Sequence, residues 1–207
     1  MSFLDDPQPD YVDETFKGLD APGVEVEGIE FEGCTFRACT FSEATFRRCK
    51  FLDCSFKDCD LSLLRPFETA FSGTRFEGCK LAGVDWTTAY WPKIGGLEPN
   101  AFVDCTLNYA TFIGLNLKGL RLERCTARDV DFTEADLTRA ACTGTDFSES
   151  RFIQTDLTEA DFTGATNYAI DATLNKLKKT KFALPEAVSL LRSLDIILVD
   201  PDAQAGG

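Results

Sequence analysis

Histidine is absent from the 207 residues, and methionine occurs only once. Histidine is the side chain that most often exchanges protons near neutral pH, and it is the commonest metal ligand, so its absence disfavours acid–base catalysis and a typical metal centre. The chain also has no basic, apolar leader and no apolar run of about 18 residues or more, the length needed to cross a membrane. We therefore expect a cytoplasmic protein without a membrane segment.

Basic residues are scarce: 21 lysines and arginines stand against 34 aspartates and glutamates, which gives a net charge of −13. Proteins that bind nucleic acids need lysine and arginine to neutralise phosphates, so the sequence predicts no direct nucleic-acid binding. The chain also lacks a phosphate-binding GxxxxGK loop and a nucleophile elbow. We expect no enzymatic activity, no cofactor and no metal.

The chain is rich instead in a five-residue repeat. Apolar side chains, most of them large, recur every five residues from Phe31 to Trp91, with Pro66 as the one exception, and again from Phe102 to Phe162, where Ala127 and Cys142 are the small members. Two positions before most of these residues lies a small or modest side chain, and this position is called here the small position. A period of five fits neither a helix nor a long strand. It fits a chain that turns a corner every five residues and points one large and one small side chain inward.

Four such sides would close a square coil of 20 residues, and successive coils would stack at about 4.8 Å. Residues 20 apart should then be alike. Phe36, Phe56 and Phe76 form one such series, and Leu117, Leu137 and Leu157 form another. The sequence therefore predicts a stacked solenoid.

The nine cysteines follow the same rule, because eight occupy the small position and Cys142 a large one. A zinc site needs ligands that converge on one point, whereas stacked cysteines point the same way. Disulfides are permitted by the expected Cα spacing, but parallel side chains and a reducing compartment disfavour them. We expect the cysteines to pack as small hydrophobic residues.

The segments ADLTR (135–139), TDFSE (145–149), TDLTE (155–159) and ADFTG (160–164) resemble the consensus of the pentapeptide-repeat family. The resemblance extends over about residues 14 to 182. It implies an all-β fold, a right-handed quadrilateral β-helix of about eight coils. We expect this β-helix at 14–183, after an acidic N-terminal segment (1–13) that is a flexible arm or a partial cap.

The segment LPEAVSLLRSLDIILVD (184–200) predicts a short helix with Pro185 near its start, followed by the strand IILV. It resembles the C-terminal cap of pentapeptide-repeat proteins that bind DNA gyrase and protect it from quinolones or the toxin albicidin. The stretch at 85–105 looks most like the albicidin-resistance type. In this group the cap joins two acidic rods that imitate duplex DNA. The resemblance implies a homodimer, with a flexible tail at 201–207 and cap contacts through Leu190, Leu191, Leu194, Ile196, Ile197 and Leu198.

The two series of large residues are separated by a step of eleven instead of ten, so the coil is interrupted near 92–100. The segment PKIGGLEPN has turn composition, and the interruption is either a one-residue bulge or a loop of several residues. An exposed loop with Tyr90, Trp91 and Lys93 would be suited to contact a partner. The alternative, which we favour, is that the tryptophans fill the core at the break.

Five aspartates precede large residues and should point outward: Asp131, Asp136, Asp146, Asp156 and Asp161. Charges balance over residues 31–91, whereas residues 92–167 carry a net charge of −5. Duplex DNA as long as the expected rod, about 38 Å, would carry about 22 charges. The net charge of the coils is therefore too small for the rod to imitate a whole duplex. A local acidic surface that imitates part of one is still compatible with the sequence. These aspartates either contact gyrase or simply keep the rod soluble.

The resulting hypothesis is a non-enzymatic protein that binds DNA gyrase, or topoisomerase IV, and protects it from an antibiotic or toxin. The alternative is a rigid scaffold or spacer that contacts another protein and has no topoisomerase target. The sequence does not choose between resistance and regulation, and it does not identify the drug or the contacting face.

Overall fold

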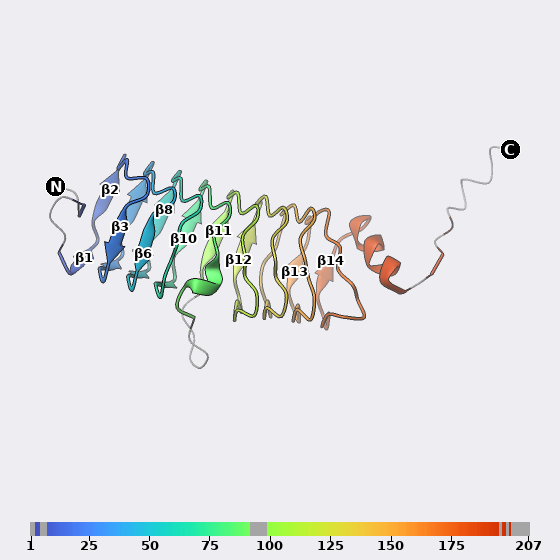
Figure 1. Cartoon of the computed structure of the whole chain (residues 1–207). Coiled ribbons are helices and arrows are strands. Elements are labelled where there is room, and N and C mark those ends of the chain that lie inside the picture. Colours follow the sequence, from blue (N-terminus) through green and yellow to red (C-terminus); the bar gives the residue numbers. More distant parts are fainter. Residues whose placement is uncertain (1–2, 5–7, 92–98, 195, 198, 200–207) are drawn as a thin grey trace.

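The computed structural model describes residues 3–4, 8–91, 99–194, 196–197 and 199. The chain winds into a rod of about eight coils, with the N-terminus at one end and a short helix at the other (Figure 1). The predicted fold, an all-β, right-handed quadrilateral β-helix, is confirmed. No helix among the described residues is both long enough and apolar enough to cross a membrane.

Short strands run along the sides of the coils, and each pairs in parallel with a strand one coil away. Phe36 pairs with Phe56, for example, so residues 20 apart are neighbours as predicted. The described residues also form two 3-10 helices, η1 (Trp86–Thr88) and η2 (Glu186–Leu194). The strands are β1 (Asp10–Val12), β2 (Thr15–Lys17), β3 (Glu25–Glu27), β4 (Glu30–Glu32), β5 (Thr35–Arg37), β6 (Thr45–Arg47), β7 (Lys50–Leu52), β8 (Ser55–Lys57), β9 (Ala70–Ser72), β10 (Arg75–Glu77), β11 (Ala101–Val103), β12 (Arg121–Glu123), β13 (Asp161–Phe162) and β14 (Lys181–Phe182).

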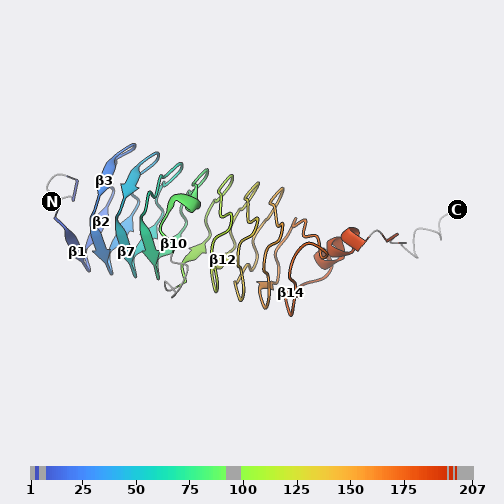
Figure 2. The same cartoon turned by 60° about the horizontal axis from the view of Figure 1, so that its bottom comes forward.

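The parallel register assigns each repeat to one of four sides of the rod, whose stacked coils are visible in Figure 2. Side 1 carries β2, β5, β8 and β10 to β14. Side 2 is a ladder of isolated bridges from Asp20 to Thr166. Side 3 carries β3 and β6 and continues by bridges to Arg151. Side 4 carries β1, β4, β7 and β9, and then bridges from Asn116 to Lys176.

Phenylalanine rings fill the interior in stacked columns. Ring centroids on side 1 lie 4.5 Å apart for Phe36 and Phe56, and 5.1 Å apart for Phe56 and Phe76. The column continues across the break, because Phe102 stacks on Phe76 at 4.9 Å. Fully burying one such side chain stabilises a protein by about 1.5–3 kcal/mol, so the repeated rings are a main source of the rod's stability.

All nine cysteines are free and buried, as expected for packing residues. The structure adds a role that the sequence analysis missed. The eight cysteines in the small position donate hydrogen bonds to backbone carbonyls one coil back, as Cys54 does to Phe31 at 3.3 Å. Thr69 shows the full pattern: its Oγ1 accepts from the Cys49 N–H at 3.2 Å and donates to the Phe46 carbonyl at 2.8 Å. The small position therefore clips neighbouring coils together.

The interruption is a loop and not a one-residue bulge. Phe76 pairs with Phe102, which lies 26 residues later instead of 20, so this coil contains six extra residues. The extra residues follow Trp91, and the coil is in register again at Asn100, whose Oδ1 accepts the Thr74 N–H at 3.0 Å. Most of the loop lies outside the described residues.

The tryptophans lie at the edge of this loop, largely as the favoured interpretation predicted. Trp86 is buried and packs edge-on against Phe71 and Phe102. Trp91 is half-buried, and its Nε1 donates to the Trp86 carbonyl at 2.7 Å. Together they close the core where the chain leaves the coil.

The N-terminal boundary differs from the expected one. Strand β1 pairs with β4, so Asp10–Val12 already belong to the first coil and not to a separate arm at 1–13. Phe3 is buried against Phe16 and Phe31. This part of the N-terminal segment therefore covers the open end of the core, as a partial cap would.

At the C-terminal end, η2 confirms the expected short helix, but the described residues of the expected strand form none. Ile196, Ile197 and Val199, its described residues, belong to no strand, because a strand needs a hydrogen-bonding neighbour and no described strand pairs with this segment. Leu198 and the expected tail at 201–207 lie outside the described residues.

Candidate partner-binding surface

The interior of the rod is filled by the stacked side chains, so binding depends on its outside. Among the described residues, no three side chains of the metal-ligating types gather into a possible metal site. A cleft of about 500 Å³ lies between the last coils and η2, and it is lined by Ser148, Glu149, Asn167, Tyr168, Ala169, Pro185, Glu186, Val188, Ser189 and Arg192.

The five aspartates predicted to contact a partner do not form one surface. Asp161 lies on side 1, Asp146 on side 2 and Asp131 on side 3. Asp136 and Asp156 lie on side 4 and are bridged to each other, which confirms the predicted stacking of this pair. The coil turns a corner every five residues, so aspartates close in sequence point in different directions.

Each of these carboxylates first serves its own turn. In all five, Oδ1 accepts the backbone N–H two residues later, at 2.9 to 3.0 Å. At Asp146 the Ser148 hydroxyl also donates to this oxygen, and the Asn167 side chain donates at 2.8 Å. These bonds to Ser148 and Asn167 hold the pKa of Asp146 below its ordinary value. The aspartate of the repeat therefore has a local structural role, whatever it binds.

Four of the five carboxylates also face a basic side chain. Lysine or arginine nitrogens lie 3.0 to 3.3 Å from Asp131, Asp136, Asp156 and Asp161. In three of these pairs the partner follows 20 residues later, as Lys176 follows Asp156, so opposite charges at that spacing were a readable signal in the sequence. Such exposed pairs contribute about 0–1 kcal/mol each. These pairs neutralise the charge of four of the five aspartates. Asp146 is the one of the five that makes no ion pair with a described lysine or arginine.

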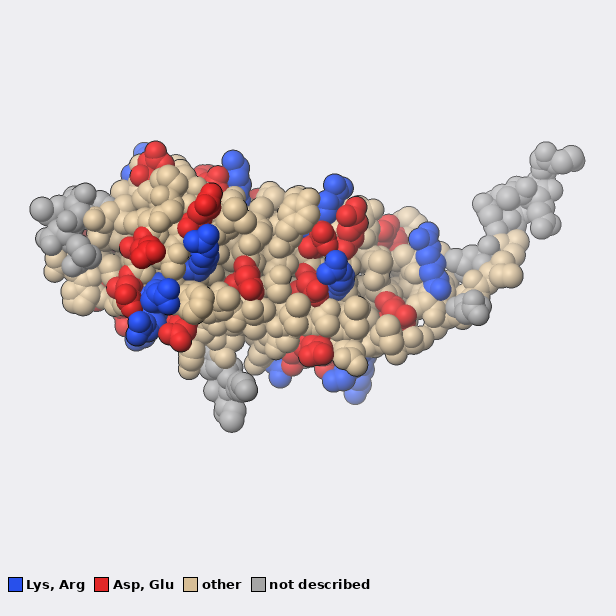
Figure 3. All heavy atoms as spheres, in the orientation of Figure 1, with Lys and Arg blue, Asp and Glu red and all other residues tan. Residues whose placement is uncertain are grey.

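The most acidic side of the rod is side 2. Counted along the register, it carries six acidic and two basic residues, whereas side 1 carries six acidic and seven basic ones. On the face shown in Figure 3, acidic and basic side chains lie beside one another and form no continuous acidic surface. The acidic residues of side 2 are Asp20, Glu43, Asp60, Asp129, Asp146 and Glu149, and its basic residues are Lys80 and Arg128.

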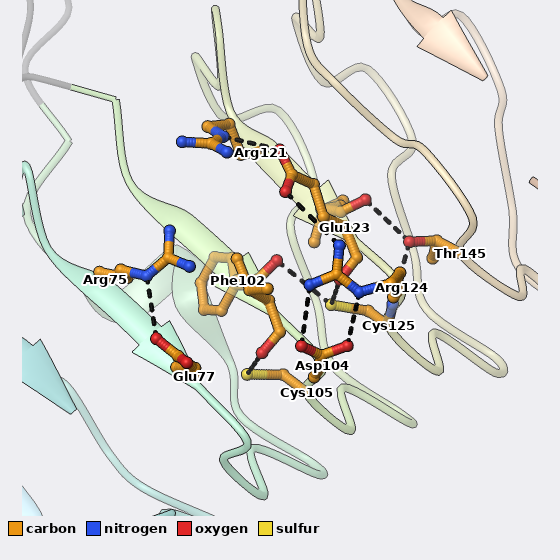
Figure 4. Close-up of polar contacts among 12 residues, drawn as sticks. Arg75, Glu77, Phe102, Asp104, Cys105, Arg121, Glu123, Arg124, Cys125 and Thr145 are labelled. Carbon is orange, nitrogen blue, oxygen red and sulfur yellow. Dashed lines mark hydrogen bonds and ion pairs between the residues drawn. The ribbon is translucent and has the colours of Figure 1, made fainter. Parts of the chain in front are cut away.

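Part of side 1 carries a group of paired charges (Figure 4). Arg124 contacts both carboxylate oxygens of Asp104, at 2.8 and 2.9 Å, and holds the pKa of that carboxyl below its ordinary value. Arg121 pairs with Glu123 at 2.7 Å. Beneath them, the Cys125 N–H donates to Thr145 Oγ1 at 3.1 Å, which is the coil clip described above. In this part of side 1 the charges are paired with one another, whereas Glu14, Lys17, Arg37 and Asp58, nearer the N-terminus, make no ion pair with a described residue.

The loop residues predicted to contact a partner are only partly described. Tyr90 is exposed on side 4, and its backbone N–H donates to the Thr69 carbonyl at 2.9 Å, so its position is fixed by the coil. Lys93 lies outside the described residues. The loop remains a predicted contact.

The residues predicted to form a dimer interface give η2 and the segment after it an apolar surface. Leu190 packs against the core, and Leu191 and Leu194 are exposed on η2. Ile196 is exposed, and Ile197 is 91% exposed. No part of the described chain covers this apolar surface.

The geometry defines a class: a β-solenoid with a filled core that presents stacked columns of side chains on its outer sides. A family model described as "Pentapeptide repeat region" matches residues 29–95, and one described as "Pentapeptide repeats (8 copies)" matches 105–140 and 135–166. Together these matches cover more than half of the chain. The chain therefore belongs to the pentapeptide-repeat family.

Solved structures show the same fold, although no curated protein matches the sequence. The chain is similar to QnrB1, described as a plasmid-mediated fluoroquinolone resistance protein. A trypsin-treated variant of QnrB1 matches with a TM-score of 0.65 and 21% identity, over 89% of this chain and 100% of that chain. Full-length QnrB1 matches with a TM-score of 0.57 and 21% identity, over 90% and 100% of the two chains. At this identity the likeness establishes the fold.

Proposed function

We propose that this chain is a non-enzymatic protein that binds DNA gyrase, or topoisomerase IV, and protects it from an antibiotic or toxin. The likeness in fold to a fluoroquinolone resistance protein supports this proposal, as does the resemblance of the C-terminal segment to the cap of gyrase-binding family members. The observation that carries it is the acidic side 2. Quinolones and albicidin are the two classes of drug to test.

Side 2 offers the enzyme a local substitute for DNA. Six carboxylates against two basic side chains leave an excess of four negative charges along this side. Duplex DNA of similar length, about 38 Å, would carry about 22 charges. The rod would therefore replace DNA at one contact on the enzyme and not along a whole duplex. Asp146 and Glu149 lie at the end nearest the cap.

We further propose a cytoplasmic homodimer formed through the cap. The exposed leucines and isoleucines of η2 and the segment after it would be buried between two copies. Leu191→Asp combined with Ile197→Asp should then give a monomer in light scattering, because buried carboxylates oppose association. A dimer of unchanged stability would remove these residues from the interface.

Gyrase supercoiling, measured with the purified chain alone and then against albicidin and a quinolone, tests the function. The double variant Glu43→Lys/Glu149→Lys reverses two side 2 charges. Its matched control, Glu134→Lys/Glu159→Lys, changes the net charge by the same amount, but on sides 3 and 4. We expect the side 2 variant to need at least tenfold more protein for half-maximal protection, a change worth about 1.4 kcal/mol. We expect the control to act like the natural protein.

Other outcomes are equally informative. Equal loss in both variants would show that total charge matters and that side 2 does not. Loss in Asp136→Lys/Asp156→Lys would instead support the pair predicted from the sequence. No effect of the natural protein on gyrase or topoisomerase IV would refute the proposal and leave the scaffold as the explanation.

A further inference from the structure

Exposed apolar side chains gather on one side of the rod. Between residues 8 and 183, eight large apolar side chains of the described chain are exposed. Two of them, Val12 and Tyr90, lie on side 4. Three others, Phe67, Ile113 and Ile153, lie on side 3, and Leu174 lies at its corner with side 4. Leu63 and Tyr109 lie at the corner between sides 2 and 3, in the column that also holds Glu43, Asp129 and Glu149 of side 2. Scattered apolar residues on a surface need no explanation, but alignment on one side does.

Three of these residues form a regular column, called here the side 3 stripe: Phe67, Ile113 and Ile153. They occupy the same position of the repeat on every second coil, and their exposed fractions are 44, 42 and 44%. Threonine occupies this position on the coils between and after them, at Thr87, Thr133 and Thr173. Because coils stack at about 4.8 Å, successive apolar residues of the stripe are about 9.6 Å apart.

The N-terminal end of the stripe is flanked by free positive charge. The Arg47 guanidinium lies over the Phe67 ring, 4.9 Å from its centroid, and Arg65 lies on the same side. Neither arginine makes an ion pair with a described residue, whereas the adjacent Arg48 pairs with Glu27 at 2.6 Å. The nearby carboxylate of Asp85 is engaged by its own turn, because its Oδ1 accepts from the Thr87 N–H and hydroxyl.

At the other end of the stripe, no arginine or lysine of the described residues is free, and Glu134 is exposed there without an ion pair to a described residue. The Asp131 carboxylate is paired there with Arg151 at 3.3 Å. The stripe therefore alternates apolar residues with threonines, and its two unpaired arginines lie at one end, where Glu68 lies 3.9 Å from Arg48. This surface calls for a partner that is apolar along one face and acidic at the matching end.

We propose that side 3 is a docking surface for an amphipathic α-helix of a partner protein, lying along the rod with acidic residues over Arg47 and Arg65. Apolar residues seven apart on a helix are separated by about 10.5 Å, close to the spacing of the stripe. An extended strand repeats every two residues, at about 6.8 Å, and matches it less well. Apolar helix faces commonly bind along apolar surfaces in this way. The proposal does not depend on gyrase, because the acidic surface proposed for gyrase is side 2.

A designed peptide provides the probe. A fluorescein-labelled helical peptide of three heptads carries leucine at the two core positions and glutamate toward one end, and a second peptide has the same composition in scrambled order. Each is titrated with the full chain, and binding is measured by fluorescence anisotropy. We expect the amphipathic peptide to bind at least tenfold more tightly than the scrambled one.

Variants of the chain locate the binding. Ile113→Asp and, separately, Ile153→Asp should weaken it at least tenfold, and circular dichroism should show an intact fold because both side chains are already exposed. Val12→Asp, an exposed apolar residue on side 4, is the matched control and should have no effect. Arg65→Glu should weaken binding of the acidic peptide and favour a version with lysine in place of glutamate.

Several results would overturn the proposal: equal binding of the scrambled peptide, no effect of either isoleucine variant, or tighter binding of an extended strand-forming peptide. Light scattering provides a further check. If Ile113→Asp turned a dimer into a monomer, side 3 would hold a second copy of this chain and not a partner helix.

Discussion

Replacing Asn100 by alanine should destabilise the rod strongly, although it removes only one side-chain amide. Asn100 is buried in the small position directly after the inserted loop. Its Oδ1 accepts from the Thr74 N–H at 3.0 Å, and its Nδ2 donates to the Phe71 carbonyl at 3.1 Å. Alanine would leave both backbone groups buried and unpaired. At about 1–3 kcal/mol for each such group, the expected loss is about 2–6 kcal/mol.

This loss of stability is measured by urea unfolding monitored through tryptophan fluorescence, because buried Trp86 and half-buried Trp91 lie beside the break. Asn100→Thr is the decisive companion variant. A threonine in this position can make both bonds, as Thr69 does, so it should recover most of the stability. Asn116→Ala, on the exposed surface, should change the free energy of unfolding by less than about 0.5 kcal/mol. If Asn100→Ala changed the free energy of unfolding no more than this control does, the two hydrogen bonds of Asn100 would not stabilise the stacked coils.

Three further predictions concern the core and the turns. Phe56→Ala should cost about 3–5 kcal/mol in urea unfolding, because it opens a cavity in the stacked column. Cys59→Thr should be tolerated better than Cys59→Val in the same assay, since valine leaves the Cys39 N–H and the Phe36 carbonyl unpaired. The folded-state pKa of Asp146 is depressed, so its carboxylate stabilises the fold above the unfolded pKa of about 4, and this is lost as pH falls through the folded value. Asp146→Asn should therefore lower the melting temperature at pH 7 and have little effect near pH 2.

The sequence was sufficient to predict the fold because every coil obeys the same local constraints. A large residue must point inward every five positions, so the stacking of Phe36 on Phe56 follows from counting alone. The burial of the cysteines follows in the same way. Their hydrogen bonds do not, because hydrophobic periodicity says nothing about which backbone groups a corner leaves unpaired.

The length of the break could not be predicted for a simple arithmetic reason. A column of period five is shifted by one position whether one residue or six are inserted. Only the pairing of Phe76 with Phe102 chooses between them. The prediction of a C-terminal strand was wrong for its described residues, and for a different reason. The segment IILV has strand composition, but a strand also needs a hydrogen-bonded neighbour, and Ile196 and Ile197 have none in the described chain.

The candidate surface was the least predictable part, because five outward aspartates that are close in sequence lie on four different sides of the rod. A corner every five residues sends Asp131 to side 3 and Asp136 to side 4. Membership of a surface is therefore decided by spacing in multiples of 20 and not by closeness in sequence. The same spacing pairs Asp156 with Lys176 and Asp161 with Lys181, which neutralises two of the predicted residues.

The insertion preserves this arrangement along the whole rod. Because the coil with the six extra residues returns to the column it left, Phe102 stacks on Phe76, and the bridges on sides 2 and 3 continue from Lys80 to Thr106 and from Asp85 to Thr111. Had the chain resumed one side later, acidic side 2 would run into the apolar stripe of side 3. The register instead keeps the two surfaces distinct from end to end. A rigid rod of this kind can present an acidic side and an apolar side to two different contacts at the same time.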